Sequence, residues 1–502
     1  MKKSFNEFLE VLKESDLVVE AKFDEAAGAR LVNDISYNSM DVNEESMFIC
    51  KGLYFKDVYL EDALAKGAFC YVAERIINPD APYIIVNDIR KAMTVIGSFF
   101  YDSIWNEKLV MMGITGTKGK TTTTTFVNSI MNDYMESLGR QKISFLSGNY
   151  TFDGVHTRNP KKMTTLETLE LHKHLADSIA NGCEYMVTEV SSQAVKHGRT
   201  DALKFKVATL VNVERDHISD IEHPDFEDYF SCKLGLFKQS EIACINLDLN
   251  EEHVARNFEV AKEYCKKIYT YSRYNEDADF YGYDTETGPE ELCFKCKWEG
   301  GVEDIVVSIG GDYNTSNALA AIAMTRALGV PFENIKSGLA NVKVEGRMEI
   351  HRIPSKNVDV VVDFAHNTIS YNALFGNVHK FYPGRKIMLV FGCRGDKAYN
   401  RRKDLGELAN LYADKIILTE QDHATEKVVD IAHQIMEHID DGKVLEIIED
   451  RGEAITKACE VIENDWVLVI AGNGADRYQK RGHSYIEMPT DGEFVEMYNE
   501  KH

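Results

Sequence analysis

The stretch Leu109-Val-Met-Met-Gly-Ile-Thr-Gly-Thr-Lys-Gly-Lys-Thr-Thr122 decides the fold class. It begins as an apolar run to Ile114, passes through a loop of Gly, Thr and Lys, and continues as a helical pattern from Thr122 to Met131. Glycines let backbone N–H groups approach phosphate oxygens, and the following helix adds its positive N-terminus. The sequence therefore predicts a strand, a phosphate-binding loop and a helix.

The loop Gly116-Thr-Lys-Gly-Lys-Thr121 assigns chemistry to two side chains. Lys120 is expected to bridge the outer phosphates of a nucleotide, and the hydroxyl of Thr121 to bind Mg²⁺. The spacing differs from the GxxxxGK[ST] loop, because Ile114 stands five positions before Gly119; the pattern is TGTxGKTT. An ordinary Gly/Thr turn is the alternative, and the strand before the loop and the helix after it argue against that alternative.

Further apolar runs that end in polar residues predict a parallel sheet of the α/β type. Two follow the loop, at 185–189 and 207–212, and four lie beyond residue 344, at 358–363, 386–391, 415–419 and 465–470. Strands that alternate with helices favour a doubly wound sheet, in which ligands bind at the carboxyl ends of the strands. The polar residues at the last four ends are Asp363-Phe-Ala-His366, Gly392-Cys-Arg-Gly-Asp396, Glu420-Gln-Asp422 and Gly472-Asn-Gly474.

The composition excludes several classes of protein. Of 502 residues, 57 are Lys or Arg and 81 are Asp or Glu, so the net charge of −24 excludes a broadly basic surface for nucleic acid. No apolar run reaches the ~18 residues that span a bilayer. Glu7, Glu10 and Glu14 interrupt the N-terminal segment, which predicts an amphipathic helix and not a signal peptide. The ten cysteines are scattered except for Cys293 and Cys296, which is typical of a reduced, cytoplasmic protein and only weak evidence for zinc.

Three residues beyond the loop have side chains that suit metal or phosphate chemistry. Glu189 ends the run 185–189, His217 lies in Glu214-Arg-Asp-His217, and Lys233 opens an apolar helical stretch. A carboxylate and an imidazole bind divalent ions, whereas a lysine repels them. Taken singly, Glu189 and His217 are as typical of structural residues, and Lys233 is typical of a surface charge.

The order of these motifs resembles that of the Mur ligases, the ATP-dependent amide-bond-forming family of peptidoglycan synthesis, over nearly the whole chain. Within the family, the likeness is greatest to the tripeptide synthetases that act on UDP-N-acetylmuramoyl-L-alanyl-D-glutamate. The motifs that carry the likeness are TGTKGKTT, Thr164-Thr165, Glu189-Val-Ser-Ser192 with Arg199, Arg215-Asp-His217, Gly311-Asp-Tyr-Asn314 with Asn317, Glu345-Gly-Arg347, Asp363-Phe-Ala-His366 and Gly472-Asn-Gly474.

The resemblance implies three α/β domains. They are a smaller N-terminal UDP-binding domain (residues 1–107), a central P-loop-type ATPase with a parallel sheet (108–342), and a C-terminal Rossmann-like domain that recruits the amino acid (343–502). We expect a cytoplasmic monomer that binds no nucleic acid and has no membrane span.

The resemblance also implies the cofactors and their ligands, which are ATP and two Mg²⁺ ions. Lys233 matches the family's carbamylated lysine, whose CO₂-derived carbamate would bind Mg²⁺ together with Thr121, Glu189 and His217. The implied catalytic residues are Lys120, Glu189, His217, Lys233 and Arg347. The implied ATP contacts are Gly116, Thr117, Lys118, Gly119, Lys120, Thr121, Thr122, Asn314, Asn317, Arg347, Asp363 and His366.

The implied reaction joins UDP-MurNAc-L-Ala-D-Glu to a free amino acid. The D-Glu carboxylate attacks the γ-phosphate of ATP, and the amine of the amino acid then displaces phosphate from the acyl-phosphate, without a covalent enzyme nucleophile. Three positions depart from the family: Met40 in Asn38-Ser39-Met40 replaces Arg, Leu166 replaces Pro, and His197 replaces Gln. The implied contacts of the nucleotide sugar are Ser39, Thr164, Thr165, Ser191, His197 and Arg199.

The residues implied for the amino acid favour L-lysine. Members that add diaminopimelate carry Asp-Asn-Pro-Arg, whose Arg pairs with the distal carboxylate, and the matching stretch here is Gln421-Asp-His-Ala424. Glu420, Asp422 and Glu426 make this loop acidic, which suits a cationic side chain; a solvated surface loop is the alternative. The implied contacts are Arg402 for the α-carboxylate and Asp476 for the α-amine, with Asp422, Ala424 and Gly472.

Three alternatives stay open at this point. The same ligase could use meso-diaminopimelate, ornithine or another amino acid. A folylpolyglutamate or cyanophycin type fits Thr164-Thr165 and Arg199 less well. A non-catalytic paralogue that binds UDP-muramoyl peptides is favoured by the departures at Met40, Leu166, Asn473 and Ala475, and disfavoured by the intact ATP and metal positions.

Overall fold

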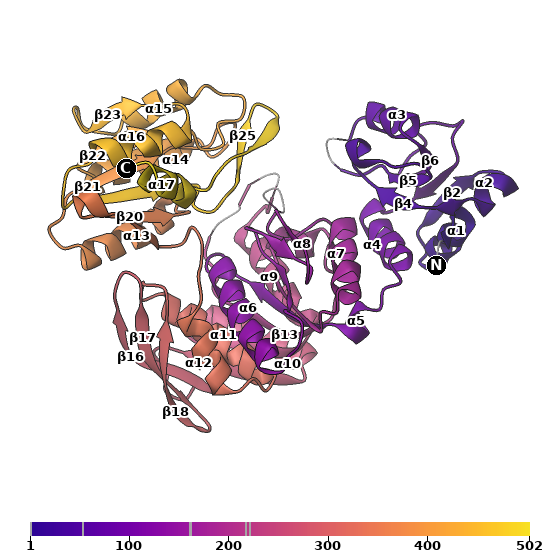
Figure 1. The fold of residues 1–502 in the computed structure, drawn as a ribbon. Helices are drawn as coiled ribbons and strands as arrows, with labels where there is room; N and C mark the ends of the chain where they lie inside the picture. The colour runs from indigo at the N-terminus through magenta and orange to yellow at the C-terminus, as the bar shows by residue number, and fades with distance from the viewer. Residues whose placement is uncertain (1–2, 53–54, 160–162, 216–217, 220–221) are drawn as a thin grey trace.

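A computed structural model describes residues 3–52, 55–159, 163–215, 218–219 and 222–502. The chain forms three α/β domains, which follow one another from indigo to yellow in Figure 1, and each is built on its own main sheet. The sheets lie within residues 18–86, 110–307 and 349–471. The predicted three-domain α/β fold is therefore confirmed, while the boundaries after residues 107 and 342 stay predictions. Among the described residues, no helix combines the length and apolarity needed to cross a membrane.

The N-terminal domain is a five-stranded sheet in the order β2-β7-β6-β5-β4, parallel except for β2. Helix α1 (Phe5–Glu14) begins at a capping box of Ser4 and Glu7, which explains why this segment folds as an amphipathic helix. Its apolar face packs with α4 (Ile89–Phe100) in one core. The other elements are β1 (Lys3–Ser4), β2 (Val18–Lys22), α2 (Glu25–Ala29), β3 (Leu31–Val32), β4 (Asp34–Ser36), η1 (Ser39–Asp41), β5 (Ser46–Ile49), α3 (Asp57–Ala65), β6 (Ala68–Ala73), β7 (Tyr83–Val86) and α5 (Trp105–Lys108).

The central domain is an eleven-stranded sheet with the phosphate-loop strand β8 between β12 and β13. These three strands are parallel, so their carboxyl ends share one edge of the sheet. A meander of β16, β17 and β18 extends the far side of the sheet. The strands are β8 (Val110–Thr115), β9 (Ser144–Leu146), β10 (Thr151–Phe152), β11 (Thr157–Arg158), β12 (Tyr185–Glu189), β13 (Phe205–Leu210), β14 (Ser240–Asn246), β15 (Lys267–Ser272), β16 (Phe280–Thr287), β17 (Leu292–Trp298) and β18 (Gly301–Val307).

Helices cover both faces of the central sheet, and each face has its own apolar core. On one face pack α6 (Lys120–Ser137), α11 (Asn314–Ala327) and α12 (Phe332–Ala340). On the other pack α7 (Thr168–Ala180), α9 (Phe226–Lys238) and α10 (Glu251–Tyr264), and the short α8 (Ser192–Lys196) contacts α9. This is the doubly wound arrangement that the alternating pattern predicts.

The C-terminal domain is a six-stranded sheet in the order β19-β20-β24-β21-β22-β23, parallel except for β19. A hairpin of β25 (Tyr478–Arg481) and β26 (Ser484–Glu487) follows β24. Helices again lie on both faces, in two separate cores. The elements are β19 (Glu349–Ile353), η2 (Pro354–Lys356), β20 (Val358–Asp363), α13 (Thr368–Phe381), β21 (Ile387–Phe391), α14 (Asn400–Tyr412), β22 (Lys415–Leu418), α15 (Val428–Met436), β23 (Val444–Ile447), α16 (Arg451–Val461), β24 (Val467–Ala471) and α17 (Asp491–Asn499).

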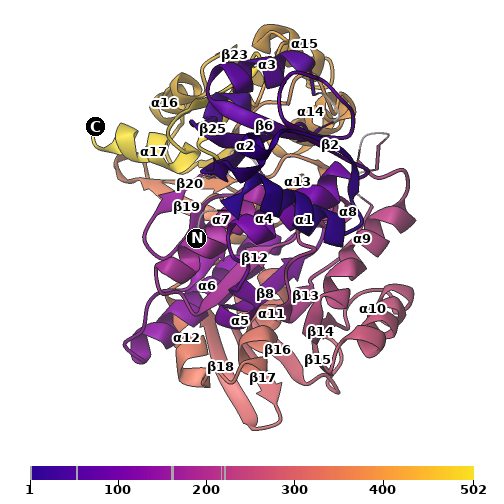
Figure 2. The same ribbon diagram turned by 90° about the vertical axis from the view of Figure 1, so that its right-hand side faces the viewer.

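The two terminal domains stand over the same side of the central domain. Figure 1 shows them apart, one on each side of the view, and Figure 2 shows both above the central domain after a quarter turn. Residues from both domains act on the carboxyl edge of the central sheet, as the contacts of Glu167 and Glu189 below demonstrate.

Candidate active site

The loop after β8 enters helix α6 at Gly119, which has a left-handed φ of +78°. A Cβ here would lie 2.5 Å from Asn317 Oδ1, so both the backbone and the available space require glycine. The loop is fixed from behind by Asn212, whose backbone oxygen accepts from Thr117 N at 3.0 Å and whose Oδ1 accepts from Lys118 N at 2.8 Å. The result is a rigid loop that leads into the positive end of an 18-residue helix.

Two lysine ammonium groups meet on this loop. Lys120 Nζ donates to Gly116 O at 2.9 Å and to Thr117 O at 3.2 Å. Lys233, from α9, is buried, donates from Nζ to Gly116 O at 2.8 Å, and lies 4.4 Å from the centre of the Tyr229 ring. Lys233 is therefore buried against the phosphate loop and does not lie on the surface. Both lysines make the loop suitable for binding anionic oxygens.

Glu189 lies beside the loop because β12 runs parallel to β8 and ends at the same edge. Its carboxylate is buried, and Oε1 accepts from Gly148 N at 3.0 Å. Burial raises the pKa of Glu189, whereas Lys120, Gly148, Thr121 and Arg347 act to lower it. Arg347 belongs to the C-terminal domain, so its charge reaches the central domain at this carboxylate.

The donor atoms at the loop fit a divalent cation. Thr121 acts on the Glu189 carboxylate, whose pKa it lowers, and hydroxyl and carboxylate oxygens are the ligands that Mg²⁺ prefers. As an ammonium ion, Lys233 opposes a nearby cation, whereas a carbamate on the same nitrogen would supply an anionic oxygen. His217 lies outside the described residues. The carbamate on Lys233 and the role of His217 stay predictions.

The two asparagines predicted to contact adenine begin helix α11 and pack against α6. Asn317 Nδ2 donates to Asn314 Oδ1 at 2.9 Å, and Asn314 Nδ2 donates to Gly310 O at 2.7 Å. Asn317 Oδ1 accepts from Thr123 Oγ1, the residue after the predicted contact Thr122, at 3.3 Å. Both asparagines are buried next to the first turns of α6, so the structure brings them together with the phosphate loop.

Asp363 and Arg347 bring the C-terminal domain to the nucleotide side. Asp363 ends β20, and its two carboxylate oxygens accept from Met348 N at 2.8 Å and from Ala365 N at 2.7 Å. Burial raises the pKa of Asp363, and Arg347 opposes that rise. The Arg347 guanidinium lies 4.6 Å from the centre of the Phe364 ring, which orients it beside Asp363.

His366 follows strand β20 in the C-terminal domain, at a position where the charge of Lys118 acts on its imidazole. Its Nδ1 lies 2.8 Å from Phe364 O, which assigns the ring proton to Nδ1. Burial, and then the charges of Arg394 and Lys118, lower the pKa of His366 well below its ordinary value. Because Lys118 belongs to the phosphate loop, the structure brings this predicted nucleotide contact near the loop as well.

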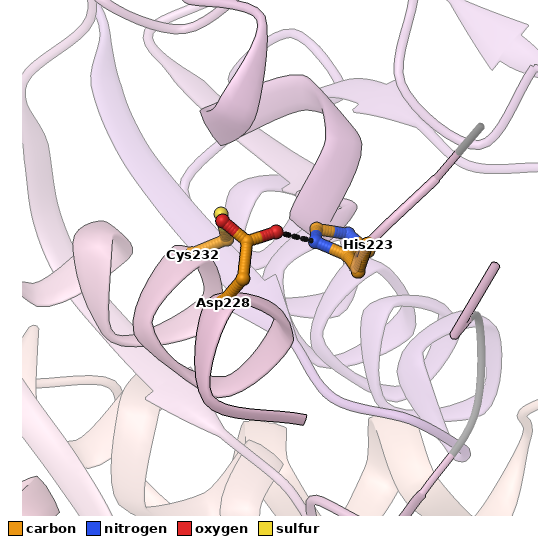
Figure 3. Close-up of side chains that lie close together, drawn as sticks. All are labelled: His223, Asp228 and Cys232. Carbon is orange, nitrogen blue, oxygen red and sulfur yellow. Dashed lines mark hydrogen bonds and ion pairs between the residues drawn. The ribbon is translucent and has the colours of Figure 1, made fainter. Parts of the chain in front are cut away.

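His223, Asp228 and Cys232 form a group with metal-ligand chemistry near α9 (Figure 3). His223 is fully buried, with Nδ1 2.6 Å from Asp228 Oδ2 and Nε2 2.9 Å from Ser192 Oγ. Asp228 also binds Lys196 Nζ at 2.7 Å. Both imidazole nitrogens and the carboxylate thus have protein partners, and the group joins α8 to the helix that carries Lys233.

The Cys293–Cys296 pair that the sequence raised as weak evidence for zinc lies on strand β17. Cys296 is buried and Cys293 is partly exposed, and every cysteine of the chain is a free thiol. Residues three apart on a strand point to opposite faces of the sheet. The pair therefore does not form a two-thiolate site.

The predicted sugar contacts gather next to Glu189, except for Ser39. Thr165 Oγ1 donates to Glu189 O at 3.0 Å and accepts from Ser191 N at 3.0 Å. Thr164 lies against Gly148, and Ser191 and His197 stand at the two ends of α8. Ser39 is buried in the N-terminal domain, where its carbonyl oxygen accepts from Lys66 Nζ at 2.9 Å.

Glu167, which the sequence analysis did not single out, forms ion pairs with three cations where the N-terminal and central domains meet. Lys51 and Arg90 come from the N-terminal domain; Lys51 binds Oε2, and Arg90 Nη1 lies 3.0 Å from Oε1. Arg199 Nε, from the central domain, lies 3.2 Å from Oε1, and Nη1 donates to Thr165 O at 3.3 Å. Burial would raise the pKa of Glu167, but Arg199, Lys51 and Arg90 lower it to about 2.

The position of Glu167, directly after Thr164-Thr165-Leu166, is the signal that could have identified it. Three cations face the carboxylate of Glu167, and the carboxylate of Glu170 lies beside it, where Oε2 accepts from Glu167 N at 3.3 Å. Three cations against two carboxylates leave the junction with surplus positive charge. The same surplus acts on His197, whose pKa is lowered by burial and then by Arg90 and Arg199. The structure therefore adds Lys51 and Arg90 to the basic groups near the predicted sugar contact Arg199.

The loop Gln421–Ala424 is not the solvated surface loop that the sequence left as the alternative, because Gln421, Asp422 and Ala424 are buried. Each of the three carboxylates in or beside it faces an arginine from elsewhere in the C-terminal domain. The acidic charge is therefore largely compensated inside the protein. The pairs are Glu420 with Arg481 (Oε2 to Nε 2.9 Å), Glu426 with Arg402 (Oε1 to Nη2 2.7 Å) and Asp422 with Arg394 (Oδ2 to Nε 3.5 Å).

Arg402, predicted to take the α-carboxylate, is engaged by protein groups. It is buried, and Nη1 donates to Glu426 Oε2 at 3.0 Å and to Gln434 Oε1 at 2.7 Å. Nη2 donates to Glu426 Oε1 at 2.7 Å and to Arg394 O at 3.3 Å. These bonds connect α14 to the loop after β21 and to Glu426.

The β25–β26 hairpin fixes the loop Gln421–Ala424 in place. Asp422 Oδ1 accepts from Lys480 N at 2.9 Å, and Ala424 N donates to Lys480 O at 3.0 Å. Ala424 is buried and has a φ of +52°. Gln421 Nε2 donates to Gly472 O at 2.6 Å, and Asp476 Oδ1 accepts from the first hairpin residue. The hairpin and the ends of two strands thus bring together four predicted contacts of the amino acid: Asp422, Ala424, Gly472 and Asp476.

Comparison with known proteins accounts for this arrangement. The model of the Mur ligase middle domain matches residues 114–325, and that of the Mur ligase, glutamate ligase domain matches residues 346–474. The UDP-N-acetylmuramoyl-L-alanyl-D-glutamate–L-lysine ligase of Enterococcus faecalis is 37% identical over 486 residues, covering 93% of this chain and 91% of that protein. The ligase of the same name from Streptococcus thermophilus is 36% identical and covers 95% of each chain.

Solved structures share the fold over the same length. A UDP-N-acetylmuramoyl-L-alanyl-D-glutamate–2,6-diaminopimelate ligase superposes with a TM-score of 0.64 at 24% identity, covering 100% of this chain and 99% of that one. The MurF ligase of Thermotoga maritima in complex with ADP superposes with a TM-score of 0.61 at 18% identity, covering 93% and 97%. With two family models and full-length relatives in agreement with the site geometry, this chain belongs to the Mur ligase family.

Proposed function

We propose that this protein is an ATP-dependent ligase that adds L-lysine to the D-Glu residue of UDP-MurNAc-L-Ala-D-Glu, a step of peptidoglycan precursor synthesis in the cytoplasm, and that it acts as a monomer. The observation that carries the proposal is the buried carboxylate of Glu189, which parallel pairing of β12 with β8 places at the sheet edge where the phosphate loop begins. Full-length relatives bear the name of this lysine-adding ligase.

ATP would lie on the phosphate loop between the central and C-terminal domains. The loop from Gly116 to Thr122 would surround the phosphates, with Lys118 facing His366 and Lys120 at the outer phosphates. Asn314 and Asn317 would contact the adenine, and Asp363 the ribose. Arg347 would reach the γ-phosphate, because its charge already acts on Glu189.

Two Mg²⁺ ions, which neutralise phosphate charge when bound, would be held by Thr121, Glu189, His217 and a carbamylated Lys233. Lys233 suits this role because its Nζ is buried against the phosphate loop, where it donates to the same Gly116 O as Lys120 Nζ.

The nucleotide sugar would lie between the N-terminal and central domains. The muramoyl dipeptide would be bound near Glu189 by Thr164, Thr165, Ser191 and His197. Ser39 would contact the uridine end of the same substrate. Arg199 would bind an anionic group of this substrate, supported by its place among surplus cations. This position directs the D-Glu carboxylate toward the γ-phosphate.

Two chemical steps follow from this geometry. The D-Glu carboxylate attacks the γ-phosphorus, the bond to the bridging oxygen of ADP breaks, and an acyl-phosphate forms. The amine of lysine then attacks the acyl carbon, loses a proton, and releases phosphate. Lys120 and Arg347 stabilise the charge that develops on the transferring phosphoryl group, which is the larger part of catalysis where no covalent nucleophile acts.

The amino acid would be bound by Gly472, Asp476, Asp422 and Ala424 in the C-terminal domain. Ala424 supports lysine over diaminopimelate, because a buried distal carboxylate would find no cation at that position. Arg402 would stabilise the surroundings of this site through its bonds to Glu426 and to Arg394 O.

Phosphate release tests the proposal. Purified protein with ATP, Mg²⁺ and UDP-MurNAc-L-Ala-D-Glu is offered single amino acids, and release with lysine is expected to exceed release with diaminopimelate or ornithine. Release with diaminopimelate alone would keep the ligase and refute lysine. Absence of release with every amino acid, together with measurable binding of the nucleotide sugar, would instead support a non-catalytic binding protein.

A further inference from the structure

His223 is a fully buried imidazole whose two ring nitrogens bond to two different helices. Its Nδ1 lies 2.6 Å from Asp228 Oδ2, in the first turn of α9 (Figure 3). Its Nε2 lies 2.9 Å from the hydroxyl of Ser192, the first residue of α8. An ionised carboxylate has no proton to donate, so Nδ1 carries the ring proton and donates it. One rigid ring therefore joins α8 to α9.

Helices α8 and α9 also contact each other directly. A Cβ on Gly235 of α9 would lie 2.7 Å from Val195 Cγ1 of α8, so the two helices leave no room for a side chain there. Lys196, at the end of α8, donates from Nζ to Asp228 Oδ2 at 2.7 Å. Asp228 Oδ2 thus receives one donor from Lys196 and one from His223, and the positive charge of the lysine disfavours a metal ion at this group.

The two helices carry groups to opposite sides of the predicted metal site. Glu189 ends β12 three residues before Ser192, so α8 begins next to this carboxylate. Lys233 lies on α9, and its Nζ donates to Gly116 O of the phosphate loop at 2.8 Å. The position of α8 relative to α9 therefore sets where Glu189 stands relative to Lys233.

Tyr229 extends the contact from His223 to the phosphate loop. The Tyr229 ring is buried and packs edge-on against the imidazole, with 5.2 Å between the ring centres. Its centre lies 4.4 Å from Lys233 Nζ, and its hydroxyl lies 3.1 Å from Thr117 Oγ1. Because a close-packed interior transmits small displacements, a shift of the imidazole would reach both the lysine and the loop.

We propose that His223 is a positioning residue of the ligase, which holds α8 and α9 in the arrangement that lets Glu189 and Lys233 bind Mg²⁺ together. This inference rests on the proposed function, in which both residues are ligands of the metal. His223 itself contacts neither substrate nor metal and acts through the contacts described above. Loss of a partner that orients metal ligands typically lowers metal affinity by about 10- to 100-fold.

Binding of Mn²⁺ in place of Mg²⁺ tests the proposal without turnover. The free Mn²⁺ is measured by electron paramagnetic resonance, with the full-length protein and ADP. His223→Asn keeps a polar atom near the position of Nδ1, and His223→Gln keeps one near that of Nε2, so each variant retains one bond and loses the other. We expect each to raise Kd for Mn²⁺ by about 10-fold or more. The Mg²⁺ concentration for half-maximal turnover should rise in parallel, while KM for lysine stays unchanged.

Glu227→Gln is the matched control, because Glu227 lies in the same turn of α9 as Asp228 but pairs with Arg256 of α10, with Oε2 2.6 Å from Nη1. It removes an ion pair of this helix and leaves the bonds of His223 in place, so its Kd for Mn²⁺ should equal that of wild type. Ser192→Ala deletes a single hydroxyl and keeps the proposal testable if a His223 variant fails to fold. It should also raise Kd for Mn²⁺, by a smaller factor. The thermal midpoint of each variant shows which of them are folded.

Three results would overturn the assignment. An unchanged Kd for Mn²⁺ in the folded variants would mean that His223 does not position the metal ligands. An equal rise in Glu227→Gln would assign the effect to a general loosening of α9. A wild-type protein that binds no Mn²⁺ would remove the metal site itself. Wild-type turnover with lysine is measured separately: a protein that binds Mn²⁺ but joins no lysine would refute the proposed function, and the Mn²⁺ affinities of the variants would still decide the role of His223.

Discussion

Lys233 and Glu167 are buried charges whose roles depend on their immediate neighbours. Lys233 Nζ contacts Gly116 O within the phosphate loop, beside a second lysine. Glu167 compensates three cations from two domains. Composition alone favours a surface position for each, and only the residues brought from elsewhere in the chain explain their burial.

Replacing Lys233 by Ala is expected to lower kcat by at least about 100-fold, because the site loses an anionic oxygen donor for Mg²⁺. A short carboxylic acid added to the assay should restore part of the activity by occupying the vacated space. Lys238→Ala, an exposed lysine of the same helix, serves as the control. A fully active Lys233→Ala protein would refute the carbamate.

The Glu167→Gln variant tests how much the ion pairs of this domain junction stabilise the fold at different pH values. The folded-state pKa of about 2 lies below the ordinary value of 4.5, so the carboxylate stabilises the fold above about pH 4.5, and this contribution is lost as the pH falls toward 2. A shift of this size corresponds to about 3 kcal/mol. We expect Glu167→Gln to lower the urea midpoint at pH 7 and the difference from wild type to shrink below pH 4.5.

Trp105 provides the signal for that measurement, because it is fully buried and its ring lies 4.7 Å from that of His172 on α7, the helix that follows Glu167. Glu184→Gln is the control, since its ion pair with Arg140 is half exposed on both sides and such pairs contribute little. Equal urea midpoints for Glu167→Gln and wild type at pH 7 would contradict the structural account of the junction.

At the scale of elements, strands were predictable and the loops between them only in part. The predicted ranges 185–189 and 358–363 agree with β12 and β20, because buried parallel strands are short apolar runs. The predicted run 207–212 is shifted, since pairing with β8 and β14 places β13 at Phe205–Leu210. Helix α6 begins at Lys120, two residues earlier than predicted, because Gly119 already provides its N-cap.

The charge of the amino-acid loop could not be predicted from its own residues. Glu420 is paired with an arginine 61 residues away and Glu426 with one 24 residues away. The composition of the loop itself shows its carboxylates but not the arginines that pair with them from distant parts of the chain. By contrast, the site motifs themselves were predictable, because the phosphate loop, Glu189 and Asp363 stand at strand ends that parallel pairing brings to defined edges.

Ala424→Arg tests whether the loop selects the amino acid. The new guanidinium would offer a partner to the distal carboxylate of diaminopimelate, so the ratio of kcat/KM for diaminopimelate to that for lysine should rise by about 10-fold or more. Part of the gain will be offset, because position 424 has a φ of +52° and is held by the hairpin. Ala424→Gln, similar in length but uncharged, is the control. An unchanged ratio would mean that this loop does not choose the substrate.

At the scale of the whole molecule, the proposed active site is divided among three domains. In this proposal the central domain supplies the phosphate loop and Glu189, and the C-terminal domain supplies Arg347, Asp363 and His366, while the N-terminal domain contacts Glu167. A binding site built from separate domains can join three substrates in order and exclude water when the domains close.

Arg347→Ala tests the contact between the central and C-terminal domains. It removes a cation whose charge acts on Glu189, and kcat should fall by about 100- to 1,000-fold with little change in KM for lysine. Arg352→Ala is the control, because this exposed arginine also joins the two domains, through Glu290, but lies outside the site. A decrease of similar size in both variants would assign the effect of Arg347 to domain association and not to catalysis.

Transfer of oxygen-18 tests the central claim most directly. UDP-MurNAc-L-Ala-D-Glu labelled in the side-chain carboxylate of D-Glu is incubated with the protein, ATP, Mg²⁺ and lysine, and both products are analysed by mass. An acyl-phosphate mechanism predicts one labelled oxygen in the released phosphate for each lysine joined to the nucleotide. Phosphate without label, or phosphate released without the lysine adduct, would contradict it.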